Sequence, residues 1–227
     1  MKKIGMVVAI EREIRAVLEE FGRPVEEKKF GPITVHTYER AGALLYVAHS
    51  GIGEIAAAAA TQLLISVYNV EMILNCGVVG GLTADMGTKK TTVVKAVVHY
   101  DYDSSPIDPV VPGQYIELPD VYIPTDATLV EKALKFFPEL TAVICASADK
   151  FVAEADAKTA LHDRYGAEVC DMESAGISLT CFRNNVPVMM LKTVADAIDG
   201  GADGYEKACL STAKVCMGIA EKLIGEL

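Results

Sequence analysis

The chain has 227 residues, of which 51% are hydrophobic and 23% charged, and its formal net charge is −10. This length predicts one large domain spanning residues 1–227, with a core that needs no disulfide or metal to support it. The acidic balance disfavours nucleic-acid binding because like charges repel, and no apolar run approaches the ~18 residues that a membrane span needs.

The predicted elements alternate between strands and helices along the chain. The first apolar run, 4–10, is followed at once by Glu11, Arg12 and Glu13, so it predicts a β-strand and not a signal peptide. Further strands are predicted at 33–38, 43–49, 71–76, 91–98, 142–146, 167–170 and 186–194. Helical periodicity predicts helices at 11–20, 54–68, 126–136, 156–164, 173–184 and 204–224. Such alternation predicts an α/β fold in which helices flank a central mixed sheet.

The stretch from Tyr100 to Thr125 is rich in Asp, Pro, Ser and Tyr and shows no clear periodicity. A long irregular segment inside a compact domain is usually a binding loop or an interface. We therefore expect this segment to contribute to a site or to contact a partner.

The six cysteines and four histidines show no spacing typical of metal ligands. We expect no metal, and we interpret the cysteines as small buried hydrophobes in a reducing cytoplasm. The glycine-rich segment Gly77–Gly81 lacks the spacing of a dinucleotide fingerprint, and no phosphate-binding P-loop motif occurs. The sequence therefore predicts no cofactor.

Polar side chains follow several predicted strands at their carboxyl ends, the edge at which open α/β sheets bind ligands. Asp171 and Glu173 follow the strand 167–170, and Asp196 ends the strand 186–194. Carboxylates placed there suggest acid/base chemistry on a polar, uncharged substrate. Each residue also has a plain structural interpretation, since Asp196 could be a turn or cap residue and Glu11 a first-turn helix acid.

Several motifs, in their order and spacing, are similar to those of the purine nucleoside phosphorylase/uridine phosphorylase superfamily. Within it the chain most resembles the 5′-methylthioadenosine/S-adenosylhomocysteine nucleosidases, whose opening acidic turn matches Ile10-Glu11-Arg12-Glu13. The other motifs are Ser50-Gly51-Ile52-Gly53, Asn75-Cys76-Gly77-Val78-Val79-Gly80-Gly81-Leu82, Ser147-Ala148-Asp149-Lys150-Phe151-Val152, Asp171-Met172-Glu173 and Ala195-Asp196. The resemblance covers nearly the whole chain and implies a nucleoside phosphorylase-like fold.

The resemblance also implies roles for individual residues. Asp196 would protonate N7 of a purine, and Glu11 would polarise the attacking water. Glu173 would bind the ribose hydroxyls, and Met172 would pack under the ribose. The remaining residues implied to bind substrate are Phe151, which stacks on the base, Val152, whose main chain reads the base edge, and Ser50, Gly77 and Val78, which line the sugar and water side.

Three functions remain open from the sequence. The first is hydrolysis of an adenine (thio)nucleoside by water, the second is phosphate-dependent cleavage, and the third is nucleoside binding without catalysis. Ala195 and Val78-Val79 depart from the residues that many relatives carry, and the segment from Tyr100 to Pro119 departs from the usual pattern, so the 5′ substituent stays open. The resemblance further implies a homodimer in which that segment helps close the neighbour's pocket.

Overall fold

The computed structural model describes residues 1–226. Strands and helices alternate along most of the chain, as the apolar pattern predicts. The strands are β1 (Lys2–Val8), β2 (Glu26–Phe30), β3 (Ile33–Arg40), β4 (Ala43–His49), β5 (Met72–Gly81), β6 (Thr91–His99), β7 (Tyr122–Pro124), β8 (Thr141–Ser147), β9 (Val169–Asp171) and β10 (Val188–Asp196). The helices are α1 (Glu11–Phe21), α2 (Glu54–Tyr68), α3 (Ala127–Phe136), α4 (Ala155–Tyr165), α5 (Ser174–Asn184) and α6 (Gly201–Ile224).

All strands join one mixed sheet, in the order β10-β6-β8-β9-β5-β1-β4-β3-β2 with β7 paired to β6. Strand β10 also pairs with β5. This extra pairing closes β5, β10, β6, β8 and β9 into a ring, while β1, β4, β3 and β2 extend from β5 as an open wing. The predicted mixed α/β fold is confirmed, although nothing in the strand pattern predicts the ring.

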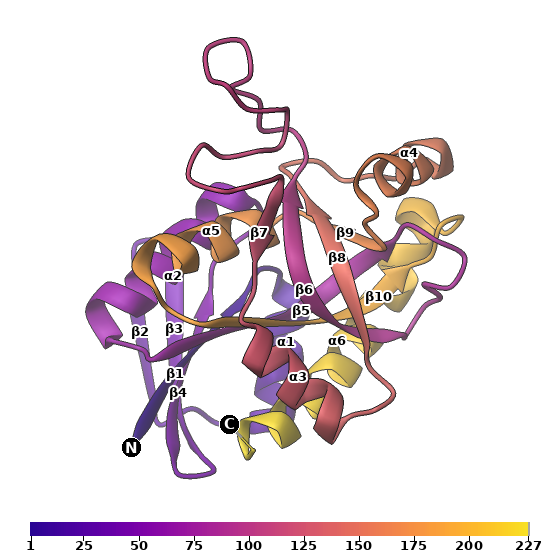
Figure 1. Cartoon of the computed structure of the whole chain (residues 1–227). Helices are drawn as coiled ribbons and strands as arrows, with labels where there is room; N and C mark the ends of the chain where they lie inside the picture. The colour runs from indigo at the N-terminus through magenta and orange to yellow at the C-terminus, as the bar shows by residue number, and fades with distance from the viewer. Residues whose placement is uncertain (227) are drawn as a thin grey trace.

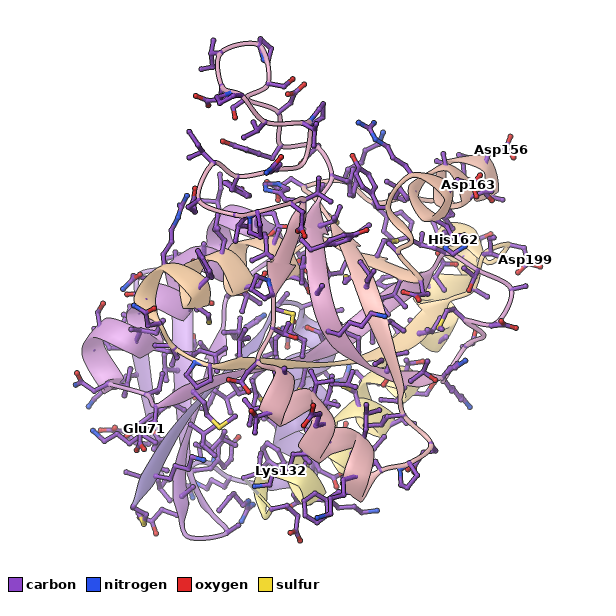
Figure 2. The ribbon with its side chains drawn as sticks, viewed as in Figure 1. Glu71, Lys132, Asp156, His162, Asp163 and Asp199 are labelled. Atoms are coloured by element: carbon purple, nitrogen blue, oxygen red, sulfur yellow. The ribbon has the colours of Figure 1, made fainter. Side chains whose placement is uncertain are left out.

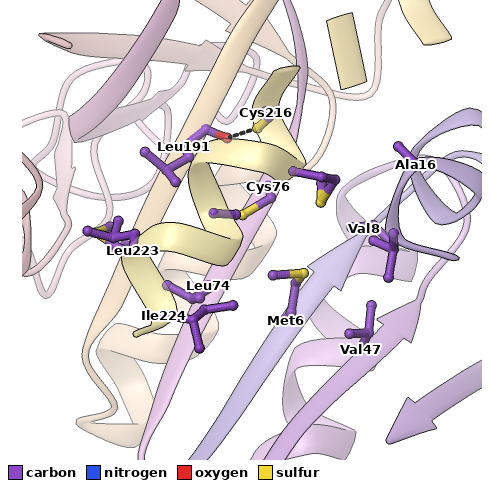
Figure 3. Packing of buried hydrophobic residues seen from close by; sticks show 14 of the residues in the cluster. Met6, Val8, Ala16, Val47, Leu74, Cys76, Leu191, Cys216, Leu223 and Ile224 are labelled. Atoms are coloured by element: carbon purple, nitrogen blue, oxygen red, sulfur yellow. Dashed lines mark hydrogen bonds between the residues drawn. The ribbon is translucent and has the colours of Figure 1, made fainter. Parts of the chain in front are cut away.

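Helices cover both faces of the sheet (Figure 1). One buried cluster joins the sheet to α1, α3 and α6, and a second joins it to α2 and α5. Figure 3 shows the first cluster, in which Leu74, Cys76 and Leu191 lie against α6 and the Cys216 thiol donates a hydrogen bond to the Leu191 carbonyl at 3.3 Å. Helix α4 lies at the end of the ring where β8 and β9 finish (Figure 1), and its Tyr165 belongs to a third, smaller buried cluster.

Strands β2 and β7 are not predicted by the sequence pattern, and strand β5 is longer than predicted. Strand β2 has almost no apolar residues because it lies at the exposed edge of the wing, so it lacks the alternation that marks a half-buried strand. Strand β7 is only three residues long. Strand β5 continues past the predicted end at residue 76, through the glycine-rich segment to Gly81, and is buried along most of its length.

The thiols of Cys76, Cys145, Cys170, Cys181, Cys209 and Cys216 are all free and buried, which confirms their interpretation as small core residues. Within residues 1–226, none of the helices combines the length and apolar character needed to cross a membrane.

Candidate active site

A cavity of about 290 Å³ opens where the ends of β1, β5, β9 and β10 meet. Three of its carboxyl groups, those of Glu13, Glu173 and Asp196, come from different parts of the chain. Most of the other lining is apolar, and it includes Ile10, Ile52, Val78, Val79, Phe151, Val152, Met172 and Tyr205. An apolar cavity with a few convergent polar groups is the usual form of a small-molecule site.

Asp196 lies at the carboxyl end of β10, as the sequence predicts. It pairs with Gly80 of β5 after an irregularity in the strand register, and Gly80 pairs in turn with Cys170 of β9. Its side chain is only 1% exposed, and its Oδ2 accepts a hydrogen bond from Lys158 Nζ at 2.6 Å. Burial raises the pKa of the Asp196 carboxyl, while the Lys158 ammonium opposes that rise. A raised pKa is what a carboxylic acid needs if it is to donate a proton near neutral pH.

The structure separates the two acids of the opening turn. Glu11 is exposed on the first turn of α1 and does not line the cavity, so the role expected of Glu11 needs correction. Glu13, two residues on, faces inward and is 4% exposed. Its Oε2 accepts hydrogen bonds from the amides of Ala9 at 2.8 Å and Ile10 at 3.2 Å, and its Oε1 accepts one from Val78 at 2.9 Å. Because one helical turn is 3.6 residues, positions 11 and 13 point in very different directions.

Gly77 and Ser50 do not line the cavity, contrary to what the resemblance implies. Gly77 lies directly beneath the Glu13 carboxylate, and a Cβ at this position would sit 2.4 Å from Glu13 Oε1. Its role is therefore to make room for that carboxylate. The Ser50 hydroxyl donates to the backbone instead: the Gly51 carbonyl lies 2.8 Å away, and the carbonyl of Val8, at the end of β1, lies 3.3 Å away. Val78 lines the cavity as expected.

Glu173 and Met172 follow β9 and both line the cavity. Glu173 Oε1 accepts a hydrogen bond from the Gly53 amide at 3.0 Å, which ties it to the start of α2. Burial and the neighbouring Asp171 raise the pKa of Glu173 to about 7. The Glu173 carboxyl can therefore either accept or donate a hydrogen bond near neutral pH.

Phe151 and Val152 form an apolar wall of the cavity. The Phe151 ring is 44% exposed and packs edge-on against Tyr205 of α6, with ring centroids 5.5 Å apart and an interplanar angle of 72°. This geometry leaves a face of the ring available for a flat ligand. The sequence around Tyr205 predicts a helix and contains no signal that this residue lines a site.

A buried polar network supports the floor of the site. Lys192 of β10 donates to Asp171 Oδ2 at 2.6 Å, and the Asp171 carboxylate more than offsets the effect of burial, so that the pKa of Lys192 is raised. The Ser147 hydroxyl lies 2.6 Å from Asp171 Oδ1 and 2.5 Å from Glu54 Oε1. A hydroxyl has a single hydrogen to donate, so one of these two carboxyl groups must carry a proton.

Glu54 is the group that carries this proton. Asp171 already accepts from the Lys192 ammonium and from the Ser174 hydroxyl at 2.5 Å, which favours its ionised form. Burial and the nearby Asp171 charge raise the pKa of Glu54 to about 8. The two hydrogen bonds then have the same direction: the protonated Glu54 donates to the Ser147 hydroxyl, and that hydroxyl donates to the Asp171 carboxylate.

Glu54→Gln should make stability less dependent on pH. Because the folded pKa of Glu54 is about 8 against an ordinary value of 4.5, the folded state holds an extra proton between these values. The free energy of unfolding that Glu54 contributes is therefore lost as pH rises from 4.5 to about 8, at ~1.4 kcal/mol per pH unit. The amide keeps a donor toward Ser147 and does not titrate.

Urea unfolding at a series of pH values measures this effect. The free energy of unfolding of Glu54→Gln should fall less steeply with pH than that of the wild type, and the exposed control Glu131→Gln should match the wild type. An unchanged slope in Glu54→Gln would mean that Glu54 is already ionised throughout.

For two site residues, Glu13 and Lys158, the signal in the sequence is a charged residue at a buried position of a helix. The buried residues of α1 are Glu13, Ile14, Ala16, Val17 and Phe21, so Glu13 is an acid within the apolar stripe of a helix. Lys158 is likewise a charged residue at a buried position, in helix α4. A charged residue at a core position of a helix is rarely buried without a partner or a function.

The protein is thus a mixed α/β protein with a cavity at the carboxyl ends of its strands. The carboxyl groups and apolar side chains that line this cavity are typical of an enzyme that acts on a small molecule. The chain belongs to the Phosphorylase superfamily, whose family model matches residues 3–224.

Related proteins match the chain over most or all of its length. The aminodeoxyfutalosine nucleosidase of Helicobacter pylori strain J99 is 29% identical over 232 residues, covering 98% of this chain and 100% of that protein. The 5′-methylthioadenosine/S-adenosylhomocysteine nucleosidase of Shewanella pealeana is 31% identical over 201 residues, covering 86% of each. A crystal structure of an aspartate-to-asparagine mutant of the H. pylori nucleosidase, with 5′-methylthioadenosine in the active site, superposes with a TM-score of 0.93 at 26% identity and full coverage of both chains. These matches confirm the predicted nucleoside phosphorylase-like fold.

Proposed function

We propose that the protein hydrolyses the N-glycosidic bond of an adenine nucleoside and releases adenine. The observation that carries this proposal is the convergence of Glu13, Glu173 and Asp196 on one largely apolar cavity beside the half-exposed ring of Phe151. The relatives that are nucleosidases by name, with adenine nucleosides among their substrates, support it.

The carboxyl groups of the cavity suit the charges that develop on the two sides of the N-glycosidic bond. Cleavage of an N-glycoside develops positive charge on the sugar and negative charge on the leaving base. Asp196 is the proposed acid that protonates purine N7 and so neutralises the base. Glu13, held by three backbone amides, is the proposed acceptor that orients and activates water. Glu173 binds the ribose hydroxyls, Met172 packs under the ribose, and the main chain of Val152 reads the base edge in this proposal.

Water is favoured over phosphate as the attacking group. A phosphate dianion placed near the Glu13 carboxylate would be repelled, by ~4 kcal/mol per pair of unit charges at ~4 Å and an effective dielectric constant of ~20. Arg12, the cation next to Glu13 in sequence, forms an ion pair with Glu206 of α6 at the surface. Lys192 is already paired with Asp171. Phosphate-dependent cleavage is therefore the second candidate.

The 5′ substituent separates the candidate substrates. The related proteins are named for 5′-methylthioadenosine, S-adenosylhomocysteine and aminodeoxyfutalosine, which share adenine and differ in that substituent. The apolar residues Ile10 and Ile52 line the cavity and suit an apolar thioether or aryl group. We propose a 5′-substituted adenine nucleoside as the substrate, used in a reducing cytoplasm that keeps the buried thiols free.

One assay tests the proposal. The protein is incubated with these three nucleosides and with deoxyadenosine, in the presence and absence of phosphate, and the free base and sugar product are identified. Adenine and a free sugar formed without phosphate support hydrolysis. A sugar phosphate formed only with phosphate supports the phosphorylase alternative, and tight binding without turnover of any nucleoside supports a binding protein.

Phe151→Ala should weaken substrate binding more than it slows the chemical step. Stacking of an aromatic side chain on a base contributes roughly 1–3 kcal/mol. The KM for the preferred nucleoside should rise accordingly while kcat changes less. Phe136→Ala removes an exposed ring from α3 and serves as the control. If Phe151→Ala leaves KM unchanged, the ring does not contact the base.

We also expect a homodimer formed through the segment from Tyr100 to Pro119, which projects from the body of the molecule between β6 and β7 (Figure 1). Its Tyr102 and Tyr115 rings stack with centroids 4.0 Å apart, so the segment is ordered by its own packing. Apolar side chains stay exposed on it, with Ile107 at 87% and Val111 at 55%. Exposed apolar side chains on an ordered segment suit a protein interface.

Light scattering measures the assembly directly. The wild type should have twice the chain mass, and Ile107→Asp combined with Val111→Asp should shift it toward the monomer. Val25→Asp, at an exposed apolar position before β2, should leave the mass unchanged. If the segment also closes the neighbour's cavity, the loop variant loses activity as it dissociates. A fully active wild-type monomer contradicts both parts.

A further inference from the structure

Helix α4 is largely exposed, and its two buried residues are Lys158 and Tyr165. Figure 2 shows Asp156 and Asp163 on this helix, and both are exposed. Lys158 is 0% exposed. A lysine ammonium is costly to remove from water unless it gains a counter-ion and hydrogen-bond acceptors. One of the two side chains by which α4 packs against the rest of the protein therefore needs a specific partner.

That partner is the proposed acid of the active site. Lys158 Nζ donates to Asp196 Oδ2 at 2.6 Å and to the Ala197 carbonyl at 2.8 Å. Among the described residues, Asp196 Oδ1 is buried without a hydrogen-bond partner, and a Cβ on Gly200 would come within 2.5 Å of it. Lys158 thus holds Oδ2 of the Asp196 carboxylate, and the turn that contains Gly200, before α6, packs against Oδ1.

The other groups that face Asp196 do not replace this cation. Asp199, from the turn after β10, is exposed and negative. Cys170 of β9 is buried, and burial raises the pKa of its thiol to about 12, so it is neutral. The facing residue of β5 is Gly80, which has no side chain. An ammonium in direct contact favours the ionised form of a carboxyl group.

This contact conflicts with proton donation. An acid that protonates purine N7 must carry a proton, whereas the Lys158 ammonium in contact with Asp196 favours the carboxylate form. We propose that Lys158 is a positioning residue that holds Asp196 as a carboxylate in the substrate-free enzyme, and that purine binding loads one solvent proton onto Asp196. The inference rests on the role proposed for Asp196. The proton balances: it passes from solvent to Asp196 when the base binds, then to N7 as the glycosidic bond breaks, which restores the carboxylate beside Lys158.

Calorimetry tests the loading step without turnover. Adenine binding is measured near neutral pH in buffers of different ionisation enthalpy, which gives the number of protons taken up. The wild type should take up about one proton per adenine. In Lys158→Met the resting carboxyl is already protonated, because it is buried without a cation, so uptake should be close to zero. Lys214→Met, which removes an exposed pair with Glu19, should behave as the wild type.

The pH dependence of kcat/KM gives a second readout. Loss of Lys158 should move the alkaline limb, where the acid loses its proton, to higher pH by at least about one unit. Lys158→Gln keeps a donor toward Asp196 and Ala197 without the charge, and it replaces Lys158→Met if that variant does not fold. Proton uptake and an alkaline limb equal to those of the wild type in the folded variant would overturn the inference. Absence of nucleoside hydrolysis by the wild type would instead overturn the proposed function, because the adenine experiment does not depend on turnover.

Discussion

Asp196→Asn should reduce adenine release by at least the ~10²–10⁴-fold that general acid catalysis contributes. The amide has nearly the same shape as the carboxyl group but cannot deliver a proton to purine N7. It also leaves Lys158 without its counter-ion, so the variant should melt at a lower temperature than the wild type. The measurement is single-turnover release of adenine from the preferred nucleoside, together with thermal unfolding.

Asp156→Asn provides the matched control, because it makes the same chemical change at an exposed position of α4 (Figure 2). Adenine binding by the Asp196→Asn protein distinguishes a lost proton donor from a collapsed site. Turnover within a few-fold of the wild type would remove Asp196 from the mechanism and leave it a structural partner of Lys158.

Glu13→Gln should also lower the rate of hydrolysis, by ~10²-fold or more if Glu13 is the general base. Gln has one acceptor oxygen where the carboxylate has two, so it cannot satisfy the amides of Ala9 and Val78 together. An unsatisfied buried amide costs about 1–3 kcal/mol, which predicts a lower melting temperature as well. Adenine binding should persist if the base contacts the opposite side of the cavity.

Glu11→Gln makes the same change two residues earlier, on the exposed face of α1. The rate of this variant should equal that of the wild type, and the contrast between the two variants separates a role in the cavity from a general effect of charge at the start of α1. The reverse result, with Glu11→Gln inactive and Glu13→Gln active, would contradict the placement of Glu13 given by the structure.

The sequence predicts the elements well because most strands are buried and α1, α3 and α6 have a clear apolar stripe. The cavity lining includes six of the residues that the resemblance implies, and their chemical roles remain predictions: Asp196, Glu173, Met172, Phe151, Val152 and Val78. The resemblance implies a site role for Glu11, whereas Glu13 lines the cavity, because the two side chains leave the first turn of α1 in different directions. A first-turn acid favours the helix dipole at either position, so the motif alone does not separate them, whereas the apolar stripe of α1 does.

Contacts between distant segments could not be predicted in the same way. Lys158 and Asp196 come from α4 and β10, and Tyr205 reaches Phe151 from α6. The Glu54–Ser147–Asp171 network joins α2, β8 and β9. Each contact depends on how the ring of strands closes, and a single sequence contains no local pattern for that pairing.

The closed ring has a consequence for synthesis of the protein. Strand β5 ends at Gly81, but its partner β10 begins only at Val188, and Asp196 lies at the far end of that strand. A nascent chain therefore emerges with most of its sheet before the last strand can insert beside β5. Pairings so distant in sequence form late, since the intervening loop must close first. We expect ribosome-bound chains that end before Val188 to lack nucleosidase activity, so that the capacity to cleave nucleosides arises only as translation nears its end.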